Sequence, residues 1–254
     1  MKVAVVFIGT DKYLNFLPTW YERCEEFFLP GVDKKYLIFT DGSVPESPDN
    51  SIVYHQEHLD WPYITLYRFR ILEKAKKDIK DCDWLIFIDA DMAVVDTVEP
   101  EDLFDESKPY IGVHHPCHFL KFPPHDKPPG AFETNPLSLA KISEEYDHSI
   151  YWQGCLWGGR IPEVFDLMKE LDRRTTIDEK NNVIAVWHDE SHLNCFYSEN
   201  IEKVHTVGPE YAFPEVFADY CDFKPKMVHM AKDNSNYHVS VSYTHLRAHE
   251  THEN

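Results

Sequence analysis

Two aspartates separated by one alanine follow directly on a buried apolar run. Asp89, Ala90 and Asp91 come after Trp84-Leu-Ile-Phe-Ile88, a run typical of a strand covered on both faces. In extended backbone the side chains at i and i+2 point the same way, so we expect the two carboxylates to converge. Carboxylates that close repel unless a cation lies between them, and oxygen ligands suit Mn²⁺ or Mg²⁺. The alternative is an ordinary acidic turn that ends a strand.

A second acidic pair lies in the segment Trp187-His-Asp-Glu-Ser-His-Leu-Asn194. Leu193, Phe196 and Tyr197 give the apolar face of a short expected helix. Asp189 is expected to cap this helix and Glu190 to lie in its first turn, where a negative charge is favourable. Neighbouring residues on a helix point about 100° apart, so the two carboxylates should have different roles. The alternative is a solvated capping pair.

The third segment alternates aromatic, amide and small residues in Tyr151-Trp-Gln-Gly-Cys-Leu-Trp-Gly-Gly159. Aromatic rings with one polar amide suit a sugar, which has apolar faces and hydroxyl edges. The alternative is a strand that closes with a Gly-Gly turn.

Strands and helices alternate along the chain and must position these three segments. Apolar runs predict strands at 3–8, 36–39 and 84–88, and apolar spacing or an opening proline predicts helices at 13–28, 62–80 and 162–173. This alternation predicts an α/β fold with a largely parallel sheet and helices on both faces. No composition shift marks a boundary, so we expect a single domain over 1–238. The stretch 116–136 holds six of the 17 prolines and is expected to be a surface excursion or a substrate loop.

Composition excludes several classes of protein. Among 254 residues, 25 Lys and Arg stand against 44 Asp and Glu, and a net charge of −19 disfavours nucleic acid as a partner. No apolar run approaches the roughly 20 residues of a membrane span. Six scattered cysteines and an N-terminus without a secretory signal predict a cytoplasmic protein, free or peripheral at a membrane surface. Residues 239–254 resemble a reading frame of a sequencing adapter, so we expect a non-native tail there, with the native C-terminus missing.

The three segments, in this order, resemble glycosyltransferase family 6, the family of the α1,3-galactosyltransferases and the ABO blood-group transferases. The similarity spans roughly residues 2–237, and the string Trp187-His-Asp-Glu-Ser-His-Leu-Asn194 is the most specific part. The resemblance implies a GT-A (Rossmann-like) fold, a UDP-sugar donor and transfer, with retention, of galactose or N-acetylgalactosamine to the 3-OH of a galactoside acceptor. A chain that begins at its first strand is more similar to the compact microbial and viral members than to the membrane-anchored animal ones.

The resemblance also implies roles for individual residues on the donor side. Asp89 and Asp91, with Ala90 between them, would hold Mn²⁺ (or Mg²⁺) against the diphosphate. Phe7, Ile8 and Tyr13 would line the uridine pocket, with Asp41 near the base or ribose and Arg68 near the nucleotide-sugar. Asp189 would bind the donor sugar, and Lys232 would close over the diphosphate.

Catalytic and acceptor residues follow from the same resemblance. Glu190 would be the catalytic carboxylate, acting through a covalent intermediate or through same-face attack, and Trp187 would pack on the acceptor. Gln153, Gly154 and Cys155 match positions that tune donor and acceptor choice, and the bulk of Cys155 favours galactose. His115 would lie on the acceptor side, but His114 and His115 stand where animal members have a tryptophan pair, so the resemblance does not extend to acceptor recognition there.

Two other classes of function stay open at this point. A non-catalytic UDP-sugar- or carbohydrate-binding protein on the same fold would bind UDP without turnover. A metal-dependent hydrolase using Asp89 and Asp91 would act without regard to any added acceptor.

Overall fold

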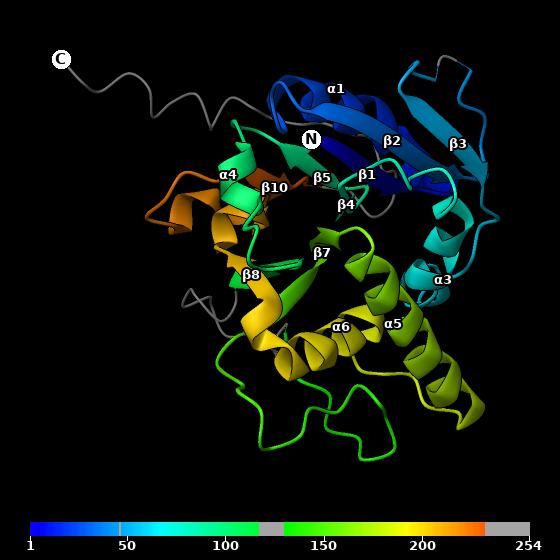
Figure 1. The fold of residues 1–254 in the computed structure, drawn as a ribbon, viewed down its shortest axis with the longest axis vertical. Helices are drawn as coiled ribbons and strands as arrows, with labels where there is room; N and C mark the ends of the chain where they lie inside the picture. The colour runs from blue at the N-terminus through cyan, green and yellow to red at the C-terminus, as the bar shows by residue number, and fades with distance from the viewer. Residues whose placement is uncertain (46, 117–129, 232–254) are drawn as a thin grey trace.

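A seven-stranded sheet forms the centre of the protein in the computed structural model, which describes residues 1–45, 47–116 and 130–231 (Figure 1). The strand order is β3-β2-β1-β4-β7-β6-β8. The strands are β1 (Lys2–Ile8), β2 (Asp33–Thr40), β3 (Ser51–His55), β4 (Trp84–Ile88), β6 (Tyr110–His114), β7 (Trp152–Arg160) and β8 (Val204–Val207). Neighbours pair in parallel except β7, which is antiparallel to β4 and to β6. The predicted α/β fold with a mostly parallel sheet is therefore confirmed.

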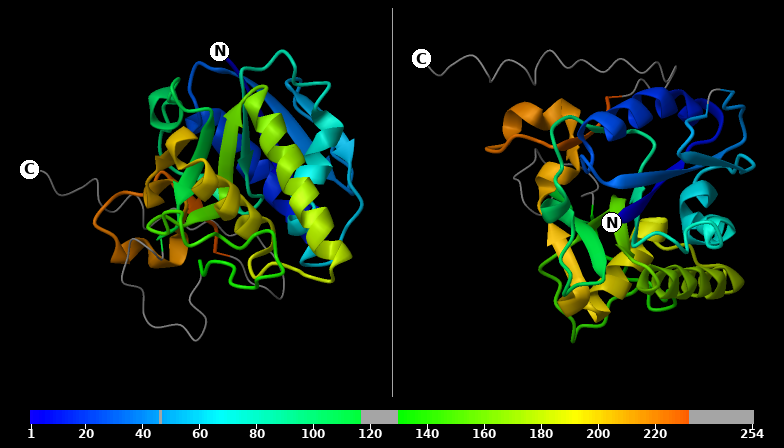
Figure 2. Two further views of the ribbon diagram at one scale, coloured as in Figure 1. Left: turned by 60° about the horizontal axis from the view of Figure 1, so that its bottom comes forward. Right: turned by 45° about the horizontal axis from the view of Figure 1, so that its top comes forward.

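Helices cover both faces of this sheet, as β1 demonstrates (Figures 1 and 2). Alternate side chains of a strand point to opposite faces. Val5 belongs to the hydrophobic cluster that includes residues of α1 (Leu17–Phe27), which the 3₁₀ helix η1 (Asp11–Phe16) precedes. Val6 belongs to the second cluster, with residues of α3 (Arg68–Leu72) and α5 (Glu163–Lys180). Both faces of β1 are buried from solvent, which explains its continuous apolar sequence.

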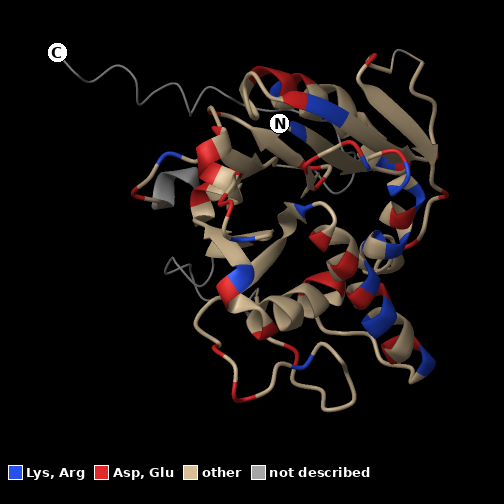
Figure 3. Ribbon diagram, viewed as in Figure 1, with Lys and Arg blue, Asp and Glu red and all other residues tan. Residues whose placement is uncertain are grey.

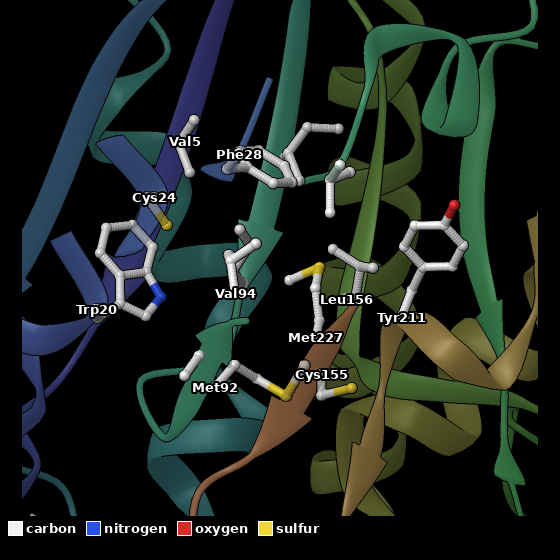
Figure 4. Packing of buried hydrophobic residues seen from close by; sticks show 14 of the residues in the cluster. Val5, Trp20, Cys24, Phe28, Met92, Val94, Cys155, Leu156, Tyr211 and Met227 are labelled. Carbon is white, nitrogen blue, oxygen red and sulfur yellow. The ribbon is translucent and has the colours of Figure 1, made fainter. Parts of the chain in front are cut away.

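A small second sheet packs on the α1 side of the main one. It contains β5 (Met92–Val94), β10 (Met227–His229) and β9 (Phe213–Pro214), in that order. Figure 4 shows the side chains of Met92, Val94 and Met227 between α1 and β7. Because β5 begins one residue after Asp91, this packing fixes the turn that carries the two aspartates.

The region predicted as one helix over 62–80 is broken into short pieces. These are α2 (Tyr63–Leu66), α3 and the 3₁₀ helix η2 (Glu73–Ala75). The break falls at Tyr67, whose φ of −95° and ψ of 10° lie outside the α region. The prediction of a continuous helix was wrong here, because apolar spacing does not register a single non-helical residue.

Helix α5 is longer than the predicted 162–173, ending at Lys180. Its last turns bury polar side chains, so they carry no apolar signal in the sequence. Arg174 makes ion pairs with Glu170 and Glu199, and Asp178 accepts a hydrogen bond from the hydroxyl of Ser138 at 2.6 Å. Figure 3 shows acids and bases side by side along this helix.

Gly158 lies inside β7 and not in a closing turn. A Cβ at this position would lie 2.4 Å from the carbonyl oxygen of Leu85 on β4, closer than any side chain can approach. The strand alternative for this segment is therefore confirmed, and the Gly-Gly turn is wrong.

Shorter elements complete the fold: α4 (Pro100–Leu103), α6 (His188–Glu199) and the 3₁₀ helices η4 (Ile201–Lys203), η5 (Pro209–Tyr211) and η6 (Glu215–Tyr220). Within the described residues, no helix has the length and apolar character that a membrane crossing requires.

Candidate active site

The two aspartates lie in a tight turn between β4 and β5. The backbone N–H of Met92 donates to the carbonyl oxygen of Asp89 at 3.1 Å, and the N–H of Met230 donates to that of Asp91 at 2.8 Å. The extended-backbone reasoning was wrong for this pair, since residues 90 and 91 form a turn. Both carboxylates nevertheless act on the same neighbour. Burial first, and then the charges of Asp89, Glu190 and Asp91, raise the pKa of the Cys155 thiol, which stays neutral.

Arg68 is the buried cation of the site. Its side chain, 6% exposed, lies 3.0 Å from Asp89 and 2.9 Å from Asp189, and it donates to the carbonyl oxygen of Gly154 at 2.6 Å. Its guanidinium also lies 4.1 Å from the ring centre of Phe87. Burial opposes the charge, but the carboxylates outweigh it and raise the pKa of Arg68 above its ordinary value. Arg68 therefore joins α3, β4, β7 and α6 at one point.

Asp189 does not cap α6. The N-cap residue is Trp187, and Asp189 lies in the first turn with its side chain buried against Arg68. Burial raises the pKa of Asp189, and the guanidinium opposes that rise. The prediction of a cap was wrong, and so was the alternative of a solvated pair. The ion pair with Arg68 directs this carboxylate toward the interior of the protein and away from solvent.

Glu190 is held by two hydrogen-bond donors from β7 and the residue before it. The hydroxyl of Tyr151 donates to Oε1 at 2.7 Å, and the N–H of Gly154 donates to Oε2 at 2.7 Å. Burial raises the pKa of Glu190 to about 7, although both donors lower it, and the charge of Asp189 adds to the rise. A carboxyl group with this pKa changes between its two protonation states near neutral pH.

These residues line one pocket with a volume of about 180 Å³. Eight residues predicted from sequence meet in its wall: Arg68, Asp89, Gln153, Gly154, Cys155, Trp187, Asp189 and Glu190. Four more were missed: Trp61, Thr65, His188 and His229. His188 belongs to the most specific motif and could have been found there. His229 is a lone polar residue in an apolar strand, and no sequence pattern connects it with the pocket.

Four other predicted residues lie near the same edge of the sheet. Ile8 ends β1, the neighbour of β4, and Asp41 directly follows β2, the next strand beyond β1. Tyr13 is in η1, and Asp41 accepts the N–H of Asp11 at 2.9 Å. Phe7 is fully buried against Trp20, so its side chain belongs to the core. Their proposed contacts with uridine stay predictions.

Three more predicted residues also lie outside the pocket wall. His115 packs its ring against Tyr151, the hydrogen-bond donor to Glu190, with 5.7 Å between ring centres. Asp91 has Oδ1 3.9 Å from Nδ1 of His229, and Ala90 is buried in the core between the two aspartates. Lys232 lies outside the described residues.

The charge balance of the site suits a divalent cation. Asp89, Asp189 and Glu190 act on the guanidinium of Arg68, and Asp91 lies in the same turn as Asp89, so ionised carboxylates outnumber this cation in the described part of the site. Within residues 1–45, 47–116 and 130–231, no group of three or more His, Cys, Asp or Glu side chains is arranged to hold a metal. Mg²⁺ is commonly bound by one or two carboxylates together with the phosphate groups of a substrate. The two aspartates of the turn fit this kind of site.

A pocket at the carboxyl end of central strands is where open α/β proteins bind ligands. Comparison with known families is more specific. The chain belongs to glycosyltransferase family 6, whose model matches residues 1–240. The resemblance seen in the sequence is thereby confirmed.

Several characterised relatives are similar over most of the chain. The O-antigen biosynthesis glycosyltransferase WbnI of Escherichia coli is 31% identical over 88% of this chain and 93% of its own length. The globoside α-1,3-N-acetylgalactosaminyltransferase 1 of mouse is 30% identical over 85% of this chain. The histo-blood group ABO system transferase 2 of rat is 25% identical over 90% of this chain. The chain spans 62% of the length of the mouse relative and 68% of that of the rat relative.

Proposed function

We propose that this protein is a retaining hexosyltransferase. It moves galactose, or N-acetylgalactosamine, from a UDP-sugar to the 3-OH of a galactoside acceptor in a reaction that needs Mn²⁺. The relatives support this class, because they include proteins named as α-1,3-galactosyl and α-1,3-N-acetylgalactosaminyl transferases. The observation that carries the proposal is the position of Glu190, whose pKa is about 7, in one pocket with Asp89 and Arg68.

The acidic turn is proposed to take the diphosphate end of the donor. Asp89 and Asp91 would hold Mn²⁺ or Mg²⁺, and the bound ion supplies positive charge against the departing UDP. Arg68 holds Asp89 in place through its ion pair at 3.0 Å. Lys232 is proposed as a second positive charge over the diphosphate.

The carboxylate of Glu190 is proposed to act on the sugar. Breakage of the bond to UDP leaves an oxocarbenium-like sugar with developing positive charge, which an ionised Glu190 stabilises or attacks. Tyr151 and Gly154 each donate one hydrogen bond to this carboxylate, so they set its orientation and favour its ionised form. Retention through a covalent intermediate and retention through same-face attack both fit this arrangement.

The remaining predicted residues divide between the two ends of the pocket. Ile8, Tyr13 and Asp41 are proposed to surround uridine beyond the acidic turn, while the side chain of Phe7 supports them from the core. Trp187 and His115 are proposed on the acceptor side, where the indole would pack on the apolar face of a galactoside.

The donor sugar is proposed to meet Gln153, Cys155 and Asp189. Cys155 is 2% exposed, so its thiol has little room to move away from a bulky 2-acetamido group. Galactose is therefore the proposed donor sugar over N-acetylgalactosamine.

A donor-by-acceptor panel with and without EDTA tests this function. UDP-galactose and UDP-N-acetylgalactosamine are each incubated with a set of galactosides, and UDP release is measured. The proposal expects slow release without acceptor, faster release with a galactoside, and loss of both with EDTA. Release that no acceptor changes indicates a hydrolase, and UDP binding by calorimetry without release indicates a binding protein; either result rejects the proposal.

A further inference from the structure

His229 connects the acidic turn to the opposite wall of the pocket. It is the last residue of β10 and lies opposite Met92 in the antiparallel pairing with β5. The next residue, Met230, donates its N–H to the carbonyl oxygen of Asp91. Backbone pairing at His229 and at the next residue therefore fixes the position of the His229 backbone, from which the imidazole extends.

The imidazole reaches from this strand to Gln153 on β7. The Nε2 atom of His229 lies 2.9 Å from Nε2 of Gln153. An amide nitrogen can only donate, so the ring nitrogen accepts and the ring proton is on Nδ1. Nδ1 faces Oδ1 of Asp91 at 3.9 Å, and the negative carboxylate favours a proton on that side of the ring. The opposite amide orientation would require the ring proton on Nε2 and would turn a lone pair toward Asp91.

Gln153 depends on this contact for its orientation. Its other amide atom, Oε1, is shielded from solvent and has no hydrogen-bond partner among the described residues. A glutamine side chain has three rotatable bonds and loses considerable freedom when it is fixed. The bond to His229 therefore selects one arrangement of an amide that lines the pocket next to Glu190 and Cys155.

We propose that His229 is a positioning residue that sets donor-sugar selectivity by holding the amide of Gln153. The inference rests on the proposed function, in which Gln153 meets the donor sugar. Selectivity between UDP-galactose and UDP-N-acetylgalactosamine then belongs to the pair of residues and not to Gln153 alone. β10, more than 70 residues away in sequence, takes part in choosing the sugar.

A double-mutant cycle on donor selectivity tests the inference. The ratio of kcat/KM for the two donors, and the ratio of their Kd values from calorimetry, is measured at saturating Mn²⁺ for wild type, His229→Phe, Gln153→Leu and the double variant. We expect His229→Phe to move both ratios toward one by about fivefold, the effect of one lost hydrogen bond. After Gln153→Leu, the same histidine substitution should have no further effect, because the partner is gone. His229→Gln, which offers an acceptor oxygen, should restore most of the selectivity.

The control is His188→Phe, the same substitution at another residue of the pocket wall, which makes no hydrogen bond to Gln153 within the described part of the chain. It should change the two donors equally. Additive ratios in the cycle, or equal losses for both donors in His229→Phe, overturn the inference and leave the proposed function standing. A wild-type protein that binds neither UDP-sugar overturns both.

Discussion

Replacing Glu190 with glutamine removes one negative charge and keeps the shape of the side chain. The new amide can keep both hydrogen bonds, because its oxygen accepts from the N–H of Gly154 and its NH₂ group donates to the hydroxyl oxygen of Tyr151. These two contacts are each 2.7 Å in the native protein. We therefore expect Glu190→Gln to fold, so that its effects report on the charge.

The buried negative charge of Glu190 lowers the stability of the folded protein, and the size of this effect follows from its pKa. Burial raises the pKa of Glu190 from 4.5 to about 7 in the folded protein. The native state thus binds more protons than the unfolded state between these values, and the stability of the wild type falls as pH rises through this window. A change of this size corresponds to roughly 3 kcal/mol. Glu190→Gln should match the wild type below pH 4.5 and be more stable by up to about 3 kcal/mol at pH 8.

Two measurements check this prediction. Urea unfolding at pH 4.5 and pH 8 gives the free energy of unfolding, and UDP release with an acceptor gives activity. We expect release to fall by about 10²–10³-fold, the usual effect of losing one group that stabilises a transition state. In the wild type, release should increase as pH rises through about 7, because the ionised form is the active one. A variant that keeps its activity within threefold, or that shows no pH-dependent gain in stability, would refute the reasoning.

Other substitutions test neighbouring parts of the site. Tyr151→Phe removes a donor that lowers the pKa of Glu190, so the acid limb of the pH–rate profile should shift to higher pH, and an unshifted profile contradicts the assigned bond. Asp91→Asn should raise the Mn²⁺ concentration needed for half-maximal UDP release by at least about tenfold, and an unchanged Mn²⁺ titration would exclude Asp91 as a ligand. Arg68→Met leaves the buried carboxylate of Asp189 unpaired and should reduce the free energy of unfolding by about 3–5 kcal/mol in urea at pH 7.5, where a loss below 1 kcal/mol would be inconsistent. Gly158→Ala places a Cβ 2.4 Å from a strand carbonyl and should lower Tm by several degrees in calorimetry, with an unchanged Tm as the refuting result.

The central strands could be predicted because their sequences are simple. β4 was predicted with the same bounds, since both of its faces are buried and every residue from Trp84 to Ile88 is apolar. β6 and β8 were not predicted, because they are short and their apolar pattern is interrupted by Gly112 and His205. The last part of α5 was missed for a different reason, since its buried face is made of ion pairs and hydrogen bonds.

The site was predictable wherever chemistry and sequence position coincide. Asp89, Asp189 and Glu190 stand in short motifs, and the structure brings them into one pocket. Their exact partners were not predictable, because Arg68 reaches Asp189 across the fold. The contact of Gln153 with His229 depends on the register of β10 against β5. Such long-range contacts have no local signature in a single sequence.

The reversed direction of β7 divides this strand into two halves with different tolerance to change. Because β7 runs antiparallel to β4, the residues near its start, Gln153 to Cys155, lie in the pocket wall. Gly158 and Gly159, further along the strand, lie between neighbouring backbones. Libraries that test the proposed donor selectivity should therefore vary Gln153 and Cys155 but keep Gly154, where a Cβ would lie 3.2 Å from the Cβ of Glu190. Gly158 and Gly159 should stay unchanged, because their close contacts with neighbouring backbones hold the strand in place.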